Sequence, residues 1–127
     1  MLEFFGVVGG IILIYSIYKF NQHEKEEKLF QRALGEIASG NYKEALSALN
    51  SLIMERTYWK DYNLRGAIYQ VLGDYHYALK DYEKSIELQP NININGASYI
   101  GRDEIRAMKL KKPKGYIFND TEIHLPD

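Results

Sequence analysis

A seven-residue pattern that occurs twice in the middle of the chain limits the possible folds more than any other feature. Residues 40–46 (GNYKEAL) and residues 73–79 (GDYHYAL) share a glycine, a tyrosine and an alanine–leucine pair at matching positions. The two segments begin 33 residues apart. Repeats with periods of about 20 to 50 residues are the signature of proteins that stack similar supersecondary units. The chain is therefore expected to contain two such units.

Apolar residues on both sides of the two glycines recur every three or four positions, which is the signature of amphipathic helices. Four such stripes are present: Leu29, Phe30, Ala33, Leu34, Ile37 and Ala38; Ala45, Leu49, Leu52 and Ile53; Leu64, Ile68, Val71 and Leu72; Ala78, Leu79, Tyr82, Ile86 and Leu88. Gly40 and Gly73 are expected to end one helix and to adopt the left-handed turn before the next. Pro90 should end the fourth helix. The middle of the chain is therefore predicted to be all-α, with two antiparallel helix pairs.

The second unit resembles the tetratricopeptide repeat over nearly the whole motif of about 34 residues. The matching residues are Tyr62, Arg65, Gly66, Tyr69, Gly73, Asp74, Tyr75, Ala78, Leu79, Tyr82, Ile86, Leu88, Pro90 and Asn91. The first unit matches through Ala33, Ala45 and the turn at 40–42, whereas Glu36 replaces the usual aromatic residue and Thr57 stands where proline is expected. The resemblance covers about residues 26–91 as two repeats.

The resemblance implies that small residues mark close helix crossings in the second repeat. Gly66 and Ala78 are expected to face each other, and Tyr62, Tyr69 and Tyr82 to fill the space between successive helices. Replacing Gly66 by leucine should overpack this crossing and cost on the order of 1–3 kcal/mol of unfolding free energy. Thermal unfolding measures this cost, and an unchanged midpoint would argue against the alignment.

Two repeats are fewer than the three or so that usually bury a solenoid core, so other segments must cover the ends. A C-terminal capping helix is expected from about residue 99 to 111, with Ser98 as its N-cap. Ile100, Ile105 and Met108 would pack on the second repeat. Residues 91–97 are interpreted as a linker. At the other end, residues 11–34 contain no proline or glycine, so the first repeat helix is expected to continue from the segment before it.

That preceding segment is an uncharged apolar run, residues 4–18 (FFGVVGGIILIYSIY), followed by Lys19 and Phe20. As a helix, residues 4–20 would be about 26 Å long, close to the ~30 Å hydrocarbon core of a bilayer. Tyr15, Tyr18 and Lys19 lie where interfacial anchors are common. The run is therefore predicted to be a transmembrane helix. A cleaved signal peptide is one alternative, but the sequence lacks the basic start and the small-residue cleavage site of such a peptide. A buried core helix is the other alternative, but the run lacks the polar stripe that such a helix usually has.

Gly6 and Gly10 have the Gly-x-x-x-Gly spacing, which places both on one face of the helix. Such a face allows a second membrane helix to pack closely. The alternative is that glycine is simply common in membrane helices.

Basic residues follow the apolar run, and the positive-inside rule therefore predicts an outside N-terminus and a cytosolic soluble domain. The residues concerned are Lys19, Lys25, Lys28 and Arg32, whereas the N-terminal side has only Glu3 as a charged side chain. The predicted organisation is a single-pass membrane protein with an anchor at 1–22, a repeat domain at 23–112 and an extended C-terminal tail at 113–127.

Several classes of function lack their usual sequence signals. The chain has no cysteine and a formal net charge of −1. Its three histidines are scattered, and no glycine-rich phosphate loop follows a strand pattern. The sequence therefore predicts a protein that is not an enzyme, has no cofactor or metal site, and does not bind nucleic acid.

The resemblance implies a protein-binding groove lined by the first helix of each repeat. Its residues would be Phe30, Gln31, Leu34, Lys60, Asn63, Ala67 and Gln70. Chaperone-binding members of the family hold a peptide carboxylate with lysine and asparagine, but the apolar Phe30 and Leu34 stand at the corresponding first-repeat positions. The carboxylate clamp is therefore not transferred to this chain.

The tail after Pro113 has more apolar residues than a solvated tail needs, so Tyr116 and Phe118 are predicted to join the partner surface. Packing of this tail on the chain's own repeats is the alternative. The predicted function is that of an adaptor or assembly subunit that binds other subunits of a membrane complex and contacts lipid through residues 4–20. A receptor for extended peptides and a permanent structural subunit are the alternatives.

Overall fold

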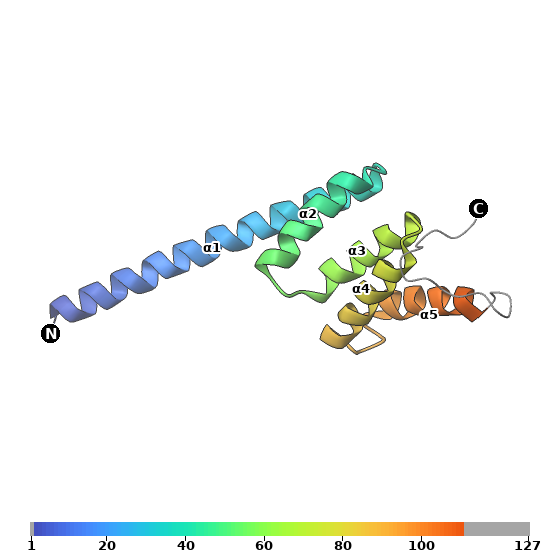
Figure 1. Ribbon diagram of the computed structural model, residues 1–127. Coiled ribbons are helices and arrows are strands. Elements are labelled where there is room, and N and C mark those ends of the chain that lie inside the picture. The colour runs from blue at the N-terminus through green and yellow to red at the C-terminus, as the bar shows by residue number, and fades with distance from the viewer. Residues whose placement is uncertain (1, 111–127) are drawn as a thin grey trace.

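The computed structural model describes residues 2–110, which form five α-helices and no strand (Figure 1). The helices are α1 (Leu2–Ala38), α2 (Tyr42–Glu55), α3 (Trp59–Val71), α4 (Tyr75–Leu88) and α5 (Gly96–Leu110). The predicted all-α fold is confirmed for this part of the chain. The predicted tail at 113–127 lies outside the described residues.

The first four helices form two antiparallel hairpins, α1 with α2 and α3 with α4, and α2 packs against α3 to join them. Both hairpin turns use glycine in the left-handed region, Gly40 with φ 75° and Gly73 with φ 82°. This conformation costs glycine little because it has no Cβ. The two turns and the end of α4 just before Pro90 confirm the predicted boundaries.

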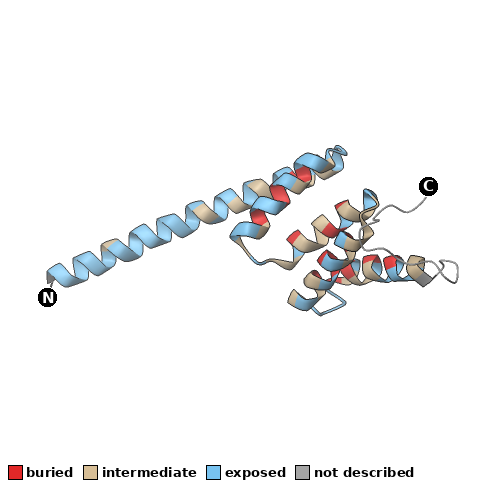
Figure 2. Ribbon diagram, viewed as in Figure 1, coloured by how far each residue is buried: buried red, intermediate tan, exposed pale blue. Residues whose placement is uncertain are grey.

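Helix α1 is a single unbroken helix of 37 residues, which confirms the predicted continuity from the apolar run into the first repeat. Its N-terminal half extends beyond the other helices and is exposed on nearly all sides (Figure 2). By length and composition it could cross a membrane, with a mean hydropathy of 1.5 and none of its apolar window buried. A signal sequence or the core helix of a soluble protein would meet the same length and composition criteria.

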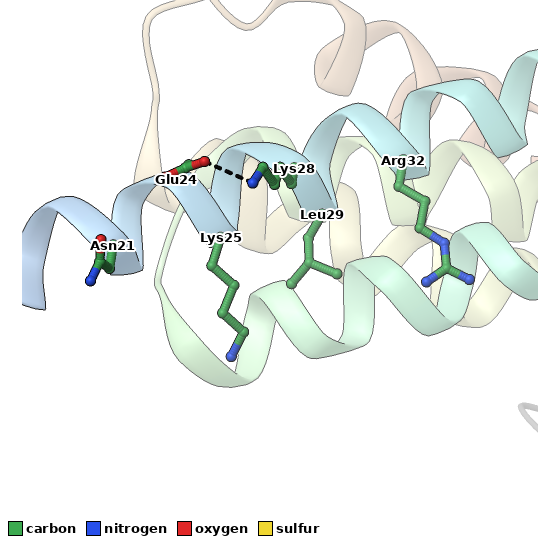
Figure 3. Close-up of a pocket in the computed structure, with 6 residues that line it drawn as sticks. All are labelled: Asn21, Glu24, Lys25, Lys28, Leu29 and Arg32. Atoms are coloured by element: carbon green, nitrogen blue, oxygen red, sulfur yellow. Dashed lines mark ion pairs between the residues drawn. The ribbon is translucent and has the colours of Figure 1, made fainter.

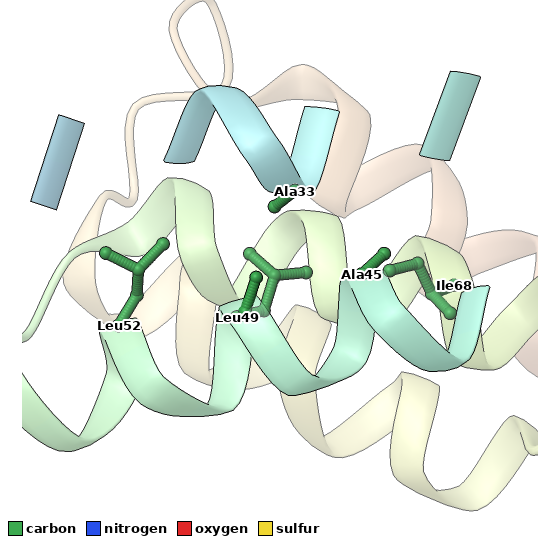
Figure 4. Close-up of a cluster of buried hydrophobic side chains, with 6 residues drawn as sticks. Ala33, Ala45, Leu49, Leu52 and Ile68 are labelled. Atoms are coloured by element: carbon green, nitrogen blue, oxygen red, sulfur yellow. The ribbon is translucent and has the colours of Figure 1, made fainter. Parts of the chain in front are cut away.

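The first hairpin and α3 share one hydrophobic core (Figure 4). Its buried members are Ala33 of α1, Ala45, Ala48, Leu49 and Leu52 of α2, and Ile68 of α3. The alanines are small where α1 and α2 meet, so the two backbones approach closely and the leucines reach across. The small positions assigned from the sequence, Ala33 and Ala45, are fully buried.

The second core surrounds Tyr82 of α4, and here one predicted contact is wrong. Ala78 is buried, but a Cβ added to Gly66 would lie 3.1 Å from the Tyr82 ring and 3.2 Å from the Cβ of Asp81. Gly66 therefore faces the next turn of α4 rather than Ala78, because the helices cross about one turn further along. The expected cost of Gly66→Leu remains, with Tyr82 as the residue that would be displaced.

Helix α5 packs on α4 and α3 and caps the second repeat, as predicted. Its first turn differs from the prediction, since α5 begins at Gly96 and Ser98 is buried inside it. Ser98 donates a hydrogen bond to Ser85 Oγ at 2.9 Å, so it fastens α5 to α4 instead of capping the helix. Ile105 is buried, whereas the relative exposure of Ile100 is 62%. The predicted packing of Ile100 is therefore wrong.

Candidate functional site

A pocket with a volume of about 200 Å³ opens where α1, α3 and the start of α5 meet. It is lined by Phe30 and Leu34 of α1, Trp59, Lys60, Asn63 and Leu64 of α3, Ile94 and Asn95 of the turn before α5, and Ala97 of α5. We call this site the groove pocket. Four residues of the predicted groove line it: Phe30, Leu34, Lys60 and Asn63.

The walls of the groove pocket are mostly apolar, and one cation lies at its edge. Phe30, Leu34 and Leu64 are half-buried, so they are covered in part and still present surface to the pocket. Lys60 is exposed, and its Nζ lies 5.6 Å from the centre of the Trp59 ring. Among the described residues no carboxylate forms an ion pair with Lys60. The pocket is therefore suited to an apolar side chain that has a negative group beside it.

The predicted binding residues Asn63 and Gln70 also hold the capping helix in place. Asn63 Nδ2 donates to Ser98 Oγ at 2.7 Å. Gln70 donates to Glu104 of α5 at 2.9 Å and accepts from the Tyr82 hydroxyl at 2.6 Å. Burial raises the pKa of Tyr82 to about 12, which keeps the hydroxyl protonated as the donor. The two amides thus join α3 to α5 and α4.

The remaining predicted site residues are not in the groove pocket. Gln31 is exposed and donates to Glu27 of its own helix at 2.9 Å. Ala67 lines a separate pocket of about 110 Å³ between α1, α2 and α3. No atom lies within 4 Å of a Cβ added at Gly6 or Gly10. Tyr116 and Phe118 lie outside the described residues.

A larger hollow of about 500 Å³ lies along α1 (Figure 3). Its lining residues all belong to α1: Asn21, Glu24, Lys25, Lys28, Leu29 and Arg32. Two of its cations are paired, Lys28 with Glu24 at 2.7 Å and Lys25 with Glu55 of α2 at 2.9 Å. Because one helix supplies every lining residue, the hollow has no opposite wall that could enclose a ligand.

Arg56 and its partners support the groove pocket, although they are not among the predicted site residues. The guanidinium donates two hydrogen bonds to the Asp61 carboxylate, each 2.8 Å long. It also lies 5.6 Å from the Phe30 ring centre and 5.0 Å from that of Tyr58. The hydrogen bond to Asp61 raises the pKa of Arg56. Arg56 thus connects α1 with the first turn of α3. The sequence offers one weak indication of this ion pair, which is that Arg56 precedes Asp61 by five residues.

Trp59, Leu64, Ile94, Asn95 and Ala97 complete the groove pocket but were not among the predicted groove residues. Trp59 and Leu64 belong to α3. Ile94, Asn95 and Ala97 belong to residues 91–97, the segment that was predicted to be a linker. Asn95 is buried and donates to Ser85 Oγ at 3.0 Å. The buried amide fixes the turn before α5, and the adjacent Ile94 can therefore form a wall of the pocket.

Stacked antiparallel hairpins with left-handed glycine turns and a C-terminal capping helix define an α-helical hairpin-repeat protein. The sequence model of the tetratricopeptide repeat matches residues 59–92, which contain α3, its turn and α4. Residues 59–92 are thus a tetratricopeptide repeat, and the first hairpin has the same arrangement of two antiparallel helices. No curated protein and no solved structure is significantly similar to the chain. Proteins of this family are typically non-catalytic and bind protein partners on concave surfaces.

Proposed function

We propose that this protein is a membrane-anchored adaptor that binds another protein of a membrane complex through the groove pocket. The observation that carries the proposal is the convergence of α1, α3 and α5 on one apolar pocket. The first helix of each repeat lines it, which is the concave side of a repeat array. The pocket is small, so it would hold one anchoring side chain of the partner rather than a long peptide.

The chemistry of the groove pocket supports a particular kind of partner residue. An aromatic or branched apolar side chain would contact Phe30, Leu34 and Leu64, and burying it would contribute about 1.5–3 kcal/mol. A carboxylate next to it would pair with Lys60. This combination favours an adaptor that recognises an apolar anchor over a receptor that holds a free peptide carboxylate.

The exposed N-terminal half of α1 supports the membrane anchor. Large apolar side chains cover it, and seven of them are more than half exposed: Phe4, Phe5, Ile11, Ile12, Leu13, Ile14 and Ile17. Monomeric soluble proteins rarely expose a continuous apolar surface of this length. We further propose that residues 4–20 cross the membrane with the N-terminus outside and the repeat domain in the cytosol, as the basic residues after the span favour.

Replacing Leu34 by arginine is expected to abolish partner binding while the chain stays folded. Leu34 lines the groove pocket but is not among the side chains packed on the first core, so the longer cation would fill the pocket without opening the core. The measurement is co-purification of partners with the tagged full-length chain from detergent-solubilised membranes.

Ser51→Arg is the matched control, because Ser51 is exposed on α2 and does not line the groove pocket. This variant should retain the partners of the original chain. If Leu34→Arg and Ser51→Arg retain the same partners in equal amounts, the groove pocket is not the binding site.

A further inference from the structure

We propose that the repeat domain itself rests on the membrane surface through the two turns that face the N-terminal half of α1. These turns are the α2–α3 turn with its flanking residues, 54–60, and the α4–α5 turn, 89–95. Together we call them the membrane-facing end. The inference rests on the proposed anchoring by α1 and adds a second, separate contact with lipid headgroups.

The order of the helices places both turns at the same end of the domain. Helix α1 runs away from its apolar half, α2 returns, α3 runs away and α4 returns (Figure 1). The α2–α3 and α4–α5 turns therefore lie towards the apolar half of α1. The glycine turns at Gly40 and Gly73 lie at the opposite end.

Contacts between α1 and the end of α2 fix the height of the membrane-facing end above the apolar run. Gln22 and Lys25 both donate hydrogen bonds to Glu55, at 2.5 and 2.9 Å. Arg56 pairs with Glu26 at 3.8 Å. Measured from Phe20 along an unbroken helix, Gln22, Lys25 and Glu26 are about 3, 8 and 9 Å further on.

Those heights correspond to the headgroup layer. A hydrocarbon core of about 30 Å within a bilayer of about 40–45 Å leaves roughly 5–8 Å of headgroups on each side. With Phe20 at the edge of the hydrocarbon, Glu55 lies among the headgroups. The usual helix tilt of about 20° can bring one side of the domain still closer to them. Because α1 has no break, the domain cannot swing away from the surface without bending the helix.

The side chains of the membrane-facing end suit this position. Met54 has a relative exposure of 88%, Ile92 of 58% and Ile94 of 56%. Tyr58 and Trp59 are half-buried and form an edge-to-face pair, followed by the exposed Lys60. Tryptophan, tyrosine and lysine are favoured at membrane interfaces. Residues 89–95 carry no charge, and the carboxylate of residues 54–60 is Glu55, which is paired with Lys25.

Trp59 is the single tryptophan of the chain, so its fluorescence reports on this end directly. The full-length chain would be reconstituted in phosphatidylcholine vesicles that carry a nitroxide either on the headgroup or deep in the acyl chains. We expect the headgroup label to quench Trp59 strongly and the deep label to quench it weakly. The matched control is Tyr77→Trp in a Trp59→Phe background, at the opposite end of the domain, which the headgroup label should quench much less.

A third single-tryptophan chain, Ile12→Trp with Trp59→Phe, tests the anchor separately. Quenching of this chain by the deep label, together with equal quenching of Trp59 and the Tyr77→Trp control, would overturn the surface contact and leave the anchor intact. Absence of quenching by the deep label would overturn both proposals.

Charged variants provide a second measurement of the surface contact. Met54→Glu, Ile92→Glu and Ile94→Glu combined should reduce quenching of Trp59 by the headgroup label, because each glutamate must leave the interface. Val71→Glu with Leu72→Glu, at the opposite end, should leave the quenching unchanged. Equal quenching of Trp59 in the original chain and in both charged variants would contradict a membrane contact made by Met54, Ile92 and Ile94.

Discussion

Replacing Gly101 by valine is expected to destabilise the chain by about 3 kcal/mol, the upper end of the usual range for an overpacked core. A Cβ added at Gly101 would lie 2.5 Å from Cε2 and 2.9 Å from the hydroxyl oxygen of Tyr82. The ring cannot retreat, because Gly66 borders its other side and its hydroxyl is hydrogen-bonded to Gln70. Denaturant unfolding of the full-length chain in mild detergent, followed by circular dichroism, measures the loss.

Gly96→Val is the matched control for Gly101→Val, because Gly96 belongs to the same helix and no atom lies within 4 Å of a Cβ added there. It should cost little beyond a change in helix propensity, which is a few tenths of a kcal/mol. Adding Tyr82→Leu to Gly101→Val should recover part of the loss, since the shorter side chain leaves room for the valine. Equal losses for Gly101→Val and Gly96→Val would show that α5 does not cross α4 at Gly101.

The contact between Gly101 and Tyr82 shows which parts of this fold can be read from sequence. The helices of both repeats were predictable because their apolar residues follow the helical period, and because Gly40 and Gly73 provide a conformation that other residues adopt at a cost. The continuity of α1 was predictable for a similar local reason, the absence of helix-breaking residues between the apolar run and Leu34. These features depend on residues that are close in the sequence.

Features that depend on how separate helices cross could not be predicted in the same way. A shift of one turn along α4 places Gly66 against Tyr82 instead of Ala78, and nothing local distinguishes the two. The sequence assigns no role to Gly101, because it does not specify where α5 docks on α4. That position depends on Asn95 and Ser98, two buried polar residues that both bond to Ser85. Without the position of α5 on α4, Ser98 has the sequence pattern of an ordinary N-cap.

The candidate site was predictable in part for the same reason. Phe30, Leu34, Lys60 and Asn63 were assigned to the groove by their positions on the first helix of each repeat, and they do line one pocket. Gln70 was assigned by the same rule, but its amide is occupied by Tyr82 and Glu104. The position of a residue in its helix thus predicts whether it lies on the concave side. Contacts with the capping helix α5 determine whether its side chain is available to bind a partner.

Replacing Arg56 by alanine is expected to have the largest effect of the substitutions considered, a loss of about 3–5 kcal/mol of unfolding free energy. Asp61 is fully buried, and the Arg56 guanidinium donates two hydrogen bonds of 2.8 Å to its carboxylate. Without the guanidinium, a buried carboxylate would have to remain charged without a partner or become protonated. The substitution also removes the cation that packs against Phe30 and Tyr58. Unfolding in detergent measures the loss.

A double substitution separates two free energies: the cost of leaving the Asp61 carboxylate buried without a partner, and the net contribution of the ion pair to stability. Arg56→Met combined with Asp61→Leu removes both charges and keeps similar volumes, so it should be much less destabilising than Arg56→Ala alone. Lys28→Ala, which removes one partner of an exposed ion pair with Glu24, should change stability little. If Arg56→Ala behaves like Lys28→Ala, Asp61 does not depend on Arg56. If Arg56→Ala lowers stability as much as expected, one guanidinium supports the groove pocket, because the same side chain fixes the start of α3 and packs on Phe30.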